Sequence, residues 1–419
     1  MKIAIAAPIA SADVRARLHA PGQTLPAGYL GAPLTGLLIG ELLDRGHQVS
    51  AITVDYRLGA AAAVVAHGPG LELTILPGRR HAWRMNGWRP GRMLDLFRCE
   101  RRAIAQAIQH AQPDVVHAHW TYEFALAALT SGVPHVVTAH DSPRQLLKMA
   151  RGPYLALRAV MARQVLRQVQ CLTAVSAPLA TQLLRDLSRP WPGSSGEPLV
   201  VPNPIAAQAL QAGAARSAPH GRRIAMVCNG WGRWKNPEPA LRAFALLRAQ
   251  WPDAELHLFG LDFGPGERAQ TWVQQHLSSA GMQFHGHLAH SELLQRLQPL
   301  DLLLHPALEE SFGVVLAEAM ALGLPVVAGA RSGAVPWVLG SHQWLVDVRS
   351  AVAMAQALTQ ALTDHGRYAQ ASRAGRERVA QAFTTASVVD AYVELYRQAQ
   401  HQQGQPGRVP MKQIQRGLS

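Results

Sequence analysis

Short apolar runs alternate with segments of helical spacing along the first half of the chain. The run Met1–Ala7 (MKIAIAA) is closed by Pro8, so it predicts a buried strand and not a secretory leader, whose apolar core is longer. Gly36–Arg45 has apolar residues at helical spacing and leads into the strand-like run Gln48–Val54. Further strands are predicted at Asp114–His117, His135–Thr138, Leu172–Val175 and Leu199–Val201, and a helix at Arg98–Ala111. This βαβα order predicts a parallel sheet with helices on both faces.

The same alternation begins again after a polar segment rich in Ala and Gly. Strands are predicted at Arg223–Cys228, Glu255–Phe259, Leu300–His305 and Pro325–Ala328, and helices at Pro239–Gln250 and Ser387–Gln400. The chain is therefore expected to comprise an N-terminal α/β domain (1–205), a linker (206–222), a second α/β domain (223–385), a final helix (386–400) and a disordered polar tail (401–419).

The composition narrows the class of protein. Apolar residues make up 48% of the chain and charged residues 16%, which is enough for packed cores and excludes disorder of the whole chain. No uninterrupted apolar run reaches about 18 residues, so no membrane-spanning helix is expected. Cys99, Cys171 and Cys228 stand far apart and form neither a metal-ligand pair nor a disulfide framework, as is typical of a reducing compartment.

The net charge of +13 favours anionic partners, such as phosphate-bearing substrates, nucleic acid or an anionic membrane. Basic residues concentrate in two stretches, 79–102, with eight Arg beside Trp83, Trp88 and Phe97, and 144–167, with Arg144, Lys148, Arg151, Arg158, Arg163 and Arg167. Basic residues beside apolar ones suit an anionic bilayer surface. No nucleic-acid motif accompanies them, so nucleic acid is not an expected partner. A solvated basic face remains the alternative interpretation.

The most informative segment is His305–Gly329 (HPALEESFGVVLAEAMALGLPVVAG). It predicts a strand that ends at His305, a loop, a helix from about Phe312 to Leu322, and another strand. A helix that opens directly after a strand offers free N–H groups and a positive dipole end, which suit a phosphate. Glu310 and Glu318 would stand about 12 Å apart if the segment were helical throughout, which leaves room for a diphosphate between them. The alternative is two solvent-exposed acids.

This segment closely resembles the E-x7-E segment of the retaining glycosyltransferases of family 4, which have the GT-B fold. The family's E-x-F-G, E-A-M-A and G-x-P-V-V stand here in register as ESFG, EAMA and GLPVV. Weaker likenesses follow in the family's order at Pro113–Trp120, Val136–Asp141, Ala174–Leu183, Val200–Ile205, Pro252–Gly260 and Tyr392–Tyr396. The resemblance implies two Rossmann-like domains that face a cleft, the first on the acceptor side and the second on the nucleotide-sugar side, with the final helix crossing back to the N-terminal domain.

The resemblance also implies roles for residues of the second domain. Glu310 would orient the donor sugar and Glu318 would bind the ribose. The backbone N–H groups of Ser311, Phe312, Gly313 and Val314 would face the diphosphate of the donor.

The loop Asn229–Pro237 (NGWGRWKNP) adds two cations to this site. Arg233 and Lys235 are suited to holding a diphosphate. Family members usually carry several residues between the two cations, whereas here only Trp234 separates them. The Arg233 guanidinium could therefore point elsewhere, and a solvated loop is the alternative.

Two residues of the first domain complete the predicted site. His140 ends the apolar run VVTAH at a strand's carboxyl end, where it would contact the donor sugar or position the acceptor; the alternative is a structural histidine. Gly31 lies in the loop Pro26–Gly36, which lacks G-x-G-x-x-G, and would let the backbone approach a phosphate or the acceptor; the alternative is a flexible loop. We expect catalysis to depend on His140, Glu310, Lys235 and Arg233.

No metal or other cofactor is expected besides the nucleotide sugar itself. His117 and His119, on either side of Ala118, together with His140 could suggest a metal site, but neither ligand spacing nor an acidic partner supports one. The sequence also contains no D-x-D motif.

The expected function is transfer of a sugar, with retention, from a nucleotide diphosphate sugar to a hydroxyl of a sugar or lipid-linked acceptor. The process would be polysaccharide, lipopolysaccharide or glycolipid biosynthesis, in the cytoplasm or at the inner face of the cytoplasmic membrane. A GT-B nucleotide-sugar epimerase and a non-catalytic nucleotide-sugar or membrane-docking protein are the alternatives.

Overall fold

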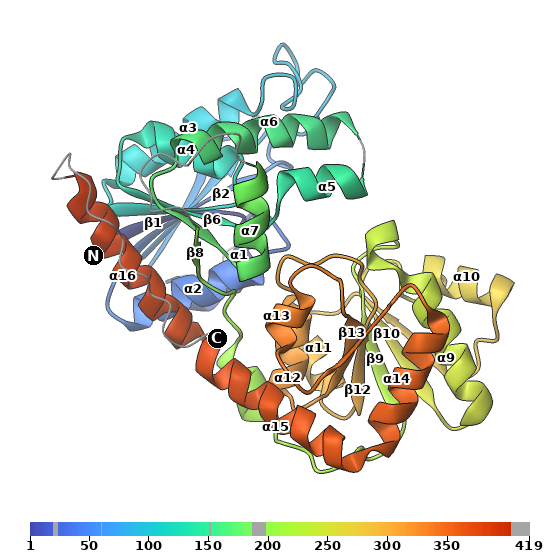
Figure 1. Cartoon of the computed structure of the whole chain (residues 1–419). Coiled ribbons are helices and arrows are strands. Elements are labelled where there is room, and N and C mark those ends of the chain that lie inside the picture. The colour runs from blue at the N-terminus through green and yellow to red at the C-terminus, as the bar shows by residue number, and fades with distance from the viewer. Residues whose placement is uncertain (20–23, 60, 151, 187–197, 404–419) are drawn as a thin grey trace. The chain divides into compact units, whose positions relative to one another are not determined.

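The computed structural model describes residues 1–19, 24–59, 61–150, 152–186 and 198–403 (Figure 1). The chain divides into two compact units. Unit 1 comprises Met1–Pro204 together with Thr385–Ser419, and unit 2 comprises Ile205–Thr384. Arg151 of the second basic stretch and residues 404–419 of the predicted tail lie outside the described residues. Residues 401–403, which were also expected to be disordered, instead form the end of the last helix, α16 (Thr385–Gln403).

Unit 1 is built on an eight-stranded sheet of order β3-β4-β2-β1-β5-β6-β7-β8. All neighbouring strands are parallel except β3, which runs antiparallel to β4. The order reverses at β1, because the chain proceeds outward from β1 to β2 and β4 and then returns to β5 on the other side of β1. The strands are β1 (Lys2–Ala6), β2 (Gln48–Asp55), β3 (Val64–Gly68), β4 (Leu71–Pro77), β5 (Val115–His119), β6 (His135–Ala139), β7 (Leu172–Ala174) and β8 (Leu199–Val200).

Helices cover both faces of this sheet. The helical segments of unit 1 are α1 (Ser11–Val14), η1 (Arg15–Arg17), α2 (Pro33–Asp44), α3 (Arg98–Ala111), α4 (Glu123–Ser131), α5 (Pro143–Met149), α6 (Pro153–Gln168), α7 (Ala177–Asp186) and α16 (Thr385–Gln403). Helices α3, α4 and α6 lie on one face, and α2 and α16 on the other (Figure 1). Val388, Val389 and Tyr392 of α16 join the same core as Ile3 and Ile5 of β1, so the end of the chain is part of unit 1.

Unit 2 contains a six-stranded parallel sheet of order β11-β10-β9-β12-β13-β14, the arrangement of a doubly wound nucleotide-binding fold. Its strands are β9 (Arg223–Val227), β10 (Glu255–Phe259), β11 (Met282–Gly286), β12 (Leu302–His305), β13 (Val326–Gly329) and β14 (Trp344–Val346). Its helical segments are α8 (Ala207–Ala212), η2 (Arg233–Lys235), α9 (Pro237–Gln250), α10 (Arg268–His276), α11 (His290–Leu297), α12 (Val314–Ala321), α13 (Val335–Leu339), α14 (Ala351–Thr363) and α15 (His365–Ala382). The central strands β9, β12 and β13 are mostly apolar, because both faces of the sheet are covered there.

Several details differ from the sequence expectations, and three of them concern unit 2. The segment expected to be a linker, 206–222, belongs to unit 2 and contains helix α8. Helix α12 begins at Val314 and not at Phe312, because Gly313 adopts a left-handed φ of 82°. Residues 310–313 are therefore not helical, and the 12 Å separation expected for Glu310 and Glu318, which assumed a continuous helix, does not apply.

Among the described residues, no helix combines the length and the apolar character that a bilayer crossing requires.

Candidate active site

The order of the unit 2 sheet places two loops side by side. Strands β9 and β12 are neighbours, but the chain continues from β9 to β10 on one side and from β12 to β13 on the other. Such a reversal of strand order is called a switch point, and open α/β sheets bind their ligands there. The loop after β9 and the loop after β12 are joined by a hydrogen bond from the Leu308 N–H to the Trp234 carbonyl, at 2.7 Å. Asn236 Nδ2 also donates to the carbonyls of Pro306 and Val348. The two loops therefore form one fixed edge.

Lys235 and Glu310 form an ion pair at this edge. Lys235 Nζ lies 2.7 Å from Glu310 Oε1, and both side chains are about four-fifths buried, with exposures of 22% and 17%. His305 Nε2, at the end of β12, lies 3.5 Å from the same carboxyl oxygen, which is too far for a well-formed hydrogen bond. Lys235 and Glu310 were predicted site residues, whereas His305 was expected only to end a strand.

The ionisation of this cluster follows from burial and neighbouring charge. Burial opposes the charge of Glu310, but His305 and Lys235 outweigh it and lower the pKa of Glu310 to about 2. Burial likewise lowers the pKa of Lys235, while Glu310 raises it by more, so that its pKa lies above the ordinary value. Both groups therefore remain charged throughout the physiological pH range.

The backbone of Glu310 is held in place from the opposite side. The Ala334 N–H donates to the Glu310 carbonyl at 2.8 Å, and Glu310 forms an isolated bridge with Gly333. Gly333 has a φ of 61°, and a Cβ there would lie 2.4 Å from Glu309 Oε1 and 2.5 Å from the Glu310 carbonyl oxygen. Only glycine therefore allows this close approach.

The loop residues 311–313 separate Glu310 from the start of α12. Gly313 is the N-cap of the helix and Val314 is its first residue, and both are partly exposed, as is Ser311. Phe312 is 2% exposed, and its ring packs edge-on against Phe383 and Trp337. The Phe312 side chain is thus a core contact that anchors the loop, and only its backbone is suited to the predicted anion contact.

Glu318 and Arg233 differ sharply in their surroundings. Glu318 is 5% exposed on α12 and accepts a hydrogen bond of 2.5 Å from His290 Nε2 of α11. His290 was not predicted as a site residue, because no sequence motif includes it. Arg233 is exposed in η2, and no ion pair within the described part of the chain includes it.

In unit 1, His140 belongs to a cluster of aromatic side chains at the carboxyl ends of β5 and β6. His140 Nε2 lies 2.9 Å from His119 Nδ1, and the His140 ring stacks on Trp120 with centroids 4.2 Å apart. Behind them, His117 contacts the Tyr396 hydroxyl and the Thr138 hydroxyl, each at 2.7 Å. The C-terminal helix α16 therefore supports the strand ends that position His140.

Burial keeps this histidine cluster neutral. It lowers the pKa of His119 to about 3 and the pKa values of His117 and His140 well below the ordinary value. In the described residues, no group of three or more His, Cys, Asp and Glu side chains is arranged to hold a metal ion.

The low pKa of His119 predicts a loss of stability in acid. The unfolded chain takes up a proton near pH 6.5, whereas the buried imidazole does not until about pH 3. The free energy of unfolding should therefore fall as the pH falls from 6.5, by up to about 1.4 kcal/mol per pH unit for each such histidine. Urea unfolding at pH 7 and pH 5 measures this loss, which should be smaller in His119→Gln. The control is His67→Gln, whose side chain is 63% exposed; equal pH dependence in all three proteins would contradict the prediction.

The loop after β1 places Gly31 in unit 1. Gly31 is exposed with a φ of 103°, and it lines a cavity of about 160 Å³ together with Tyr29, Trp120 and Glu123. The predicted site residues thus fall into two groups. Lys235, Arg233, Glu310, Glu318 and the start of α12 belong to unit 2, and Gly31 and His140 belong to unit 1.

Comparison with known proteins agrees with this architecture. The family described as Glycosyltransferase Family 4 matches residues 35–209, and the family described as Glycosyl transferases group 1 matches residues 214–378. The chain is 30% identical to D-inositol 3-phosphate glycosyltransferase of Stackebrandtia nassauensis over 328 residues, which are 72% of each chain. It is 28% identical to glycogen synthase of Mycobacterium tuberculosis H37Rv over 305 residues, 70% of this chain and 71% of the relative.

Solved structures share the fold. Sucrose-phosphate synthase from Thermosynechococcus elongatus aligns with a TM-score of 0.70 and 19% identity, over 95% of this chain and 98% of that one. Anabaena HepE in complex with UDP-glucose aligns with a TM-score of 0.63 and 17% identity, over 95% and 100%. Both units and their order along the chain are therefore those of the GT-B fold, as expected from the sequence. The chain belongs to the group 1, family 4 glycosyltransferases and is a transferase enzyme.

Proposed function

We propose that this glycosyltransferase uses a nucleotide diphosphate sugar as donor and transfers the sugar with retention to an acceptor hydroxyl. The observation that carries the proposal is the Lys235–Glu310 pair at the switch point of unit 2, in the loop that leads to the start of α12. A fixed cation and a helix N-terminus are the elements that stabilise negative charge on a departing diphosphate. The structure of HepE with UDP-glucose supports a donor of this class. Retention rests on the resemblance to the retaining family 4.

The chemistry requires charge stabilisation more than covalent help. The bond between the anomeric carbon and the diphosphate oxygen breaks, and the acceptor oxygen bonds to the same face of that carbon. The acceptor's proton passes to the departing phosphate oxygen, so neither a metal nor an enzyme nucleophile takes part in the proposed step. Lys235, Arg233 and the backbone N–H groups of 311–314 would stabilise the charge that grows on the diphosphate.

The remaining predicted residues would position the substrates. Glu310 would orient the donor sugar, and Glu318, fixed by His290, would bind the ribose. A neutral His140 would contact the sugar or position the acceptor, because its low pKa suits a hydrogen-bonding role better than a charged one. The acceptor would be a sugar or lipid-linked sugar used in polysaccharide, lipopolysaccharide or glycolipid biosynthesis.

A thermal-shift panel of nucleotides and nucleotide sugars tests the donor class. A ligand present at about 100 times its Kd stabilises the folded state by about 2.7 kcal/mol, so the preferred nucleotide sugar should raise Tm measurably. The same sugar should then be incubated with the enzyme without an acceptor. Conversion of the donor into an epimer would favour the epimerase alternative, and binding without any turnover in the presence of acceptors would favour a non-catalytic protein.

A membrane-facing role for unit 1 is a further part of the proposal. The segment 78–97 between β4 and α3 exposes Trp88 (83%), Met85 (56%) and Trp83 (42%) beside Arg84 and Arg89. Exposed aromatic and basic side chains are those that bind the interface of an anionic bilayer. The enzyme would then act on the inner face of the cytoplasmic membrane.

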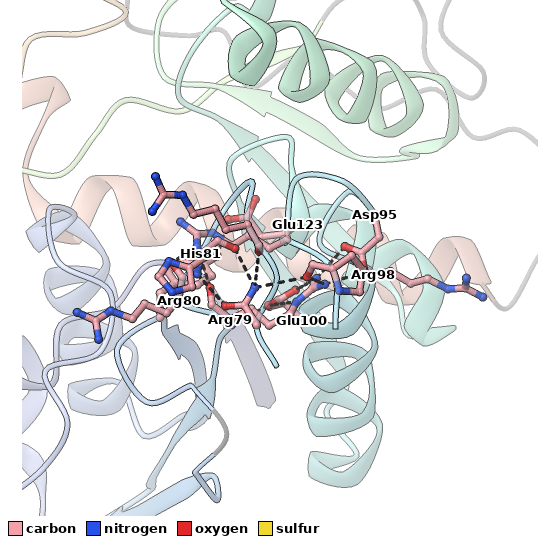
Figure 2. A network of polar contacts seen from close by, with 12 residues as sticks. Arg79, Arg80, His81, Asp95, Arg98, Glu100 and Glu123 are labelled. Atoms are coloured by element: carbon pink, nitrogen blue, oxygen red, sulfur yellow. Dashed lines mark hydrogen bonds and ion pairs between the residues drawn. The ribbon is translucent and has the colours of Figure 1, made fainter. Parts of the chain in front are cut away.

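Not every Arg of this basic stretch is available for such contact. Arg79 is 4% exposed, and its guanidinium lies between the carboxylates of Asp95 and Glu100, at 2.8 and 2.6 Å (Figure 2). Arg92 donates to the carbonyls of Arg79 and Arg80. These two arginines hold the segment together, so only part of the basic stretch is available to contact a membrane.

Removing two of the exposed charges should weaken vesicle binding. Each basic residue near an anionic surface contributes about 1 kcal/mol, so Arg84→Ala with Arg89→Ala should lower partitioning by roughly 30-fold. Co-sedimentation with anionic vesicles measures this effect, with neutral vesicles and high salt as comparisons. Arg373→Ala, an exposed charge on α15 of unit 2, is the matched control. Equal binding to neutral and anionic vesicles, or to neither, would contradict membrane docking.

A further inference from the structure

Unit 1 contains its own switch point, and a cavity lies beside it. Strands β1 and β5 are neighbours whose connections leave toward opposite faces of the sheet. The loop that follows β1 supplies Tyr29 and Gly31 to the cavity, and the end of β5 supplies Trp120. Helix α4 contributes Glu123 to the wall, and α6 contributes Arg158. In open α/β sheets, this is the position at which ligands bind.

One carboxyl oxygen of Glu123 has no hydrogen-bond partner in the described structure. The residue is 3% exposed in the first turn of α4, and its Oε1 accepts a hydrogen bond from the Tyr56 hydroxyl at 3.3 Å. Its other oxygen, Oε2, is buried and has no hydrogen-bond partner among the described residues. Buried carboxyl oxygens without partners destabilise a fold, so such an atom in a cavity wall indicates a donor that arrives with a ligand. Glu123 lies beside the Arg79 network, whose carboxylates are fully paired (Figure 2).

Arg158 brings the opposite charge to the same cavity. Its guanidinium lies 3.7 Å from the centre of the Tyr122 ring, and its Nη1 donates to the Tyr154 hydroxyl at 2.8 Å. Burial opposes the charge of Arg158, but Glu123 and the surrounding tyrosines together raise the pKa of Arg158 above its ordinary value. No ion pair within 4 Å joins Arg158 and Glu123 in the described structure. A ligand between these two side chains would find a hydrogen-bond donor in Arg158 and an acceptor in Glu123. The opposite charges of the two groups would largely cancel at the site.

Trp120 forms an aromatic wall and is held in a strained conformation. Its φ of 63° is unusual for a bulky side chain, and such strain is found where a residue is fixed for function. The face of the ring stacks on His140, and the side chain also lines the cavity. An aromatic surface beside a few polar groups is a common lining for a binding site.

We infer that this cavity binds a single neutral, polyhydroxylated ring, namely a sugar residue or cyclic polyol of the acceptor. One hydroxyl donates to Glu123 Oε2, another accepts from Arg158, and the ring packs against Trp120. The volume of about 160 Å³ is roughly half that of the smallest usual ligand pockets, so it holds one ring and not a chain. The inference rests on the proposed function, since it assigns the acceptor of that transfer.

An acceptor without a phosphate group would differ from the phosphorylated compounds that appear in the names of two similar proteins. D-inositol 3-phosphate glycosyltransferase and sucrose-phosphate synthase carry a phosphate in their names. In this cavity, a phosphate placed at Arg158 would also lie close to the carboxyl group of Glu123. A neutral ring avoids that repulsion, and specificity often depends on such a repulsive element.

Fluorine NMR of protein labelled with 5-fluorotryptophan tests the inference without an activity assay. The Trp120 signal is assigned by its loss in Trp120→Phe. The probes are glucose, mannose and myo-inositol, each compared with glucose 6-phosphate, up to about 100 mM, because a small ligand can bind at millimolar Kd. At least one neutral ring should shift the Trp120 signal in a saturable manner, and the phosphate should bind at least tenfold more weakly.

Variants locate the contact. Glu123→Ala should weaken binding of the neutral ring at least tenfold, whereas Glu72→Ala, a partly exposed carboxylate on β4, should not change it. Glu123→Gln keeps an acceptor oxygen and should retain part of the affinity, which separates a lost hydrogen bond from misfolding. No saturable Trp120 shift with any neutral ring, tighter binding of the phosphate, or unchanged binding in Glu123→Ala would each overturn the inference. Thermal shifts with nucleotides report the donor site separately, so failure of the acceptor assignment remains distinguishable from failure of the proposed function.

Discussion

Replacing Lys235 by alanine is expected to lower kcat/KM for sugar transfer by about 2–4 kcal/mol in transition-state terms, or roughly 30- to 1,000-fold. Lys235 is the buried cation of the unit 2 switch point, and its ammonium group is held 2.7 Å from Glu310. A fixed cation gains in value as negative charge grows on the departing diphosphate, so both donor affinity and turnover should fall. Initial rates over a range of donor concentrations measure the two effects.

Two comparisons make this result interpretable. Loss of Lys235 leaves the Glu310 carboxylate buried without its cation, so the Tm of the variant must be measured beside its kinetics. Arg373→Ala removes an exposed cation from the same unit and should leave kcat/KM unchanged. Wild-type kcat/KM in Lys235→Ala would remove this residue from the diphosphate site.

Glu310 and Glu318 are expected to give different kinetic signatures. Glu310→Ala should lower kcat by roughly 100-fold, because contacts to the donor sugar tighten as its ring flattens in the transition state. Glu318→Ala should raise the donor KM by roughly tenfold with a small change in kcat, because contacts to the ribose change little during the reaction. Full kinetics with the donor as varied substrate distinguish the two effects.

Two further variants serve as controls for the Glu310 and Glu318 substitutions. Glu310→Gln retains an acceptor for Lys235, so it isolates the loss of charge from the loss of the side chain. Glu377→Ala removes an exposed glutamate from α15 and should behave as wild type. If the two signatures were exchanged, the roles of Glu310 and Glu318 would be reversed; wild-type kinetics in both variants would contradict the E-x7-E assignment.

Local patterns in the sequence were sufficient to predict most of the framework. The helix Arg98–Ala111 and the strand Glu255–Phe259 have the predicted bounds, because apolar periodicity and flanking breakers mark both ends. The strands β3, β4, β11 and β14 were not predicted, because each is short or lies toward a sheet edge, where pairing with a neighbour decides the conformation more than composition does. The start of α12 was misplaced because the backbone of Gly313 is left-handed, which the residue type permits but does not require.

The candidate site could be predicted only where its residues share a motif. Glu310 and Glu318 stand in one continuous segment, and Lys235 follows a recognisable strand. His305 contacts Glu310, and His290 contacts Glu318, through folding that no local spacing encodes. The same holds for Glu123 and Arg158, which come from α4 and α6 and share a cavity only because both helices cover the same face of the unit 1 sheet.

The stereochemistry of the first product tests the central claim most directly. The α-linked donors UDP-glucose and GDP-mannose are incubated with the enzyme, and the anomeric signals of the released or transferred sugar are followed by proton NMR before mutarotation equilibrates them. The account predicts that one donor gives the α product first, together with free nucleoside diphosphate, and that Lys235→Ala nearly abolishes this signal. A β product formed first, or turnover unchanged by the loss of Lys235, would contradict retaining transfer at the unit 2 switch point.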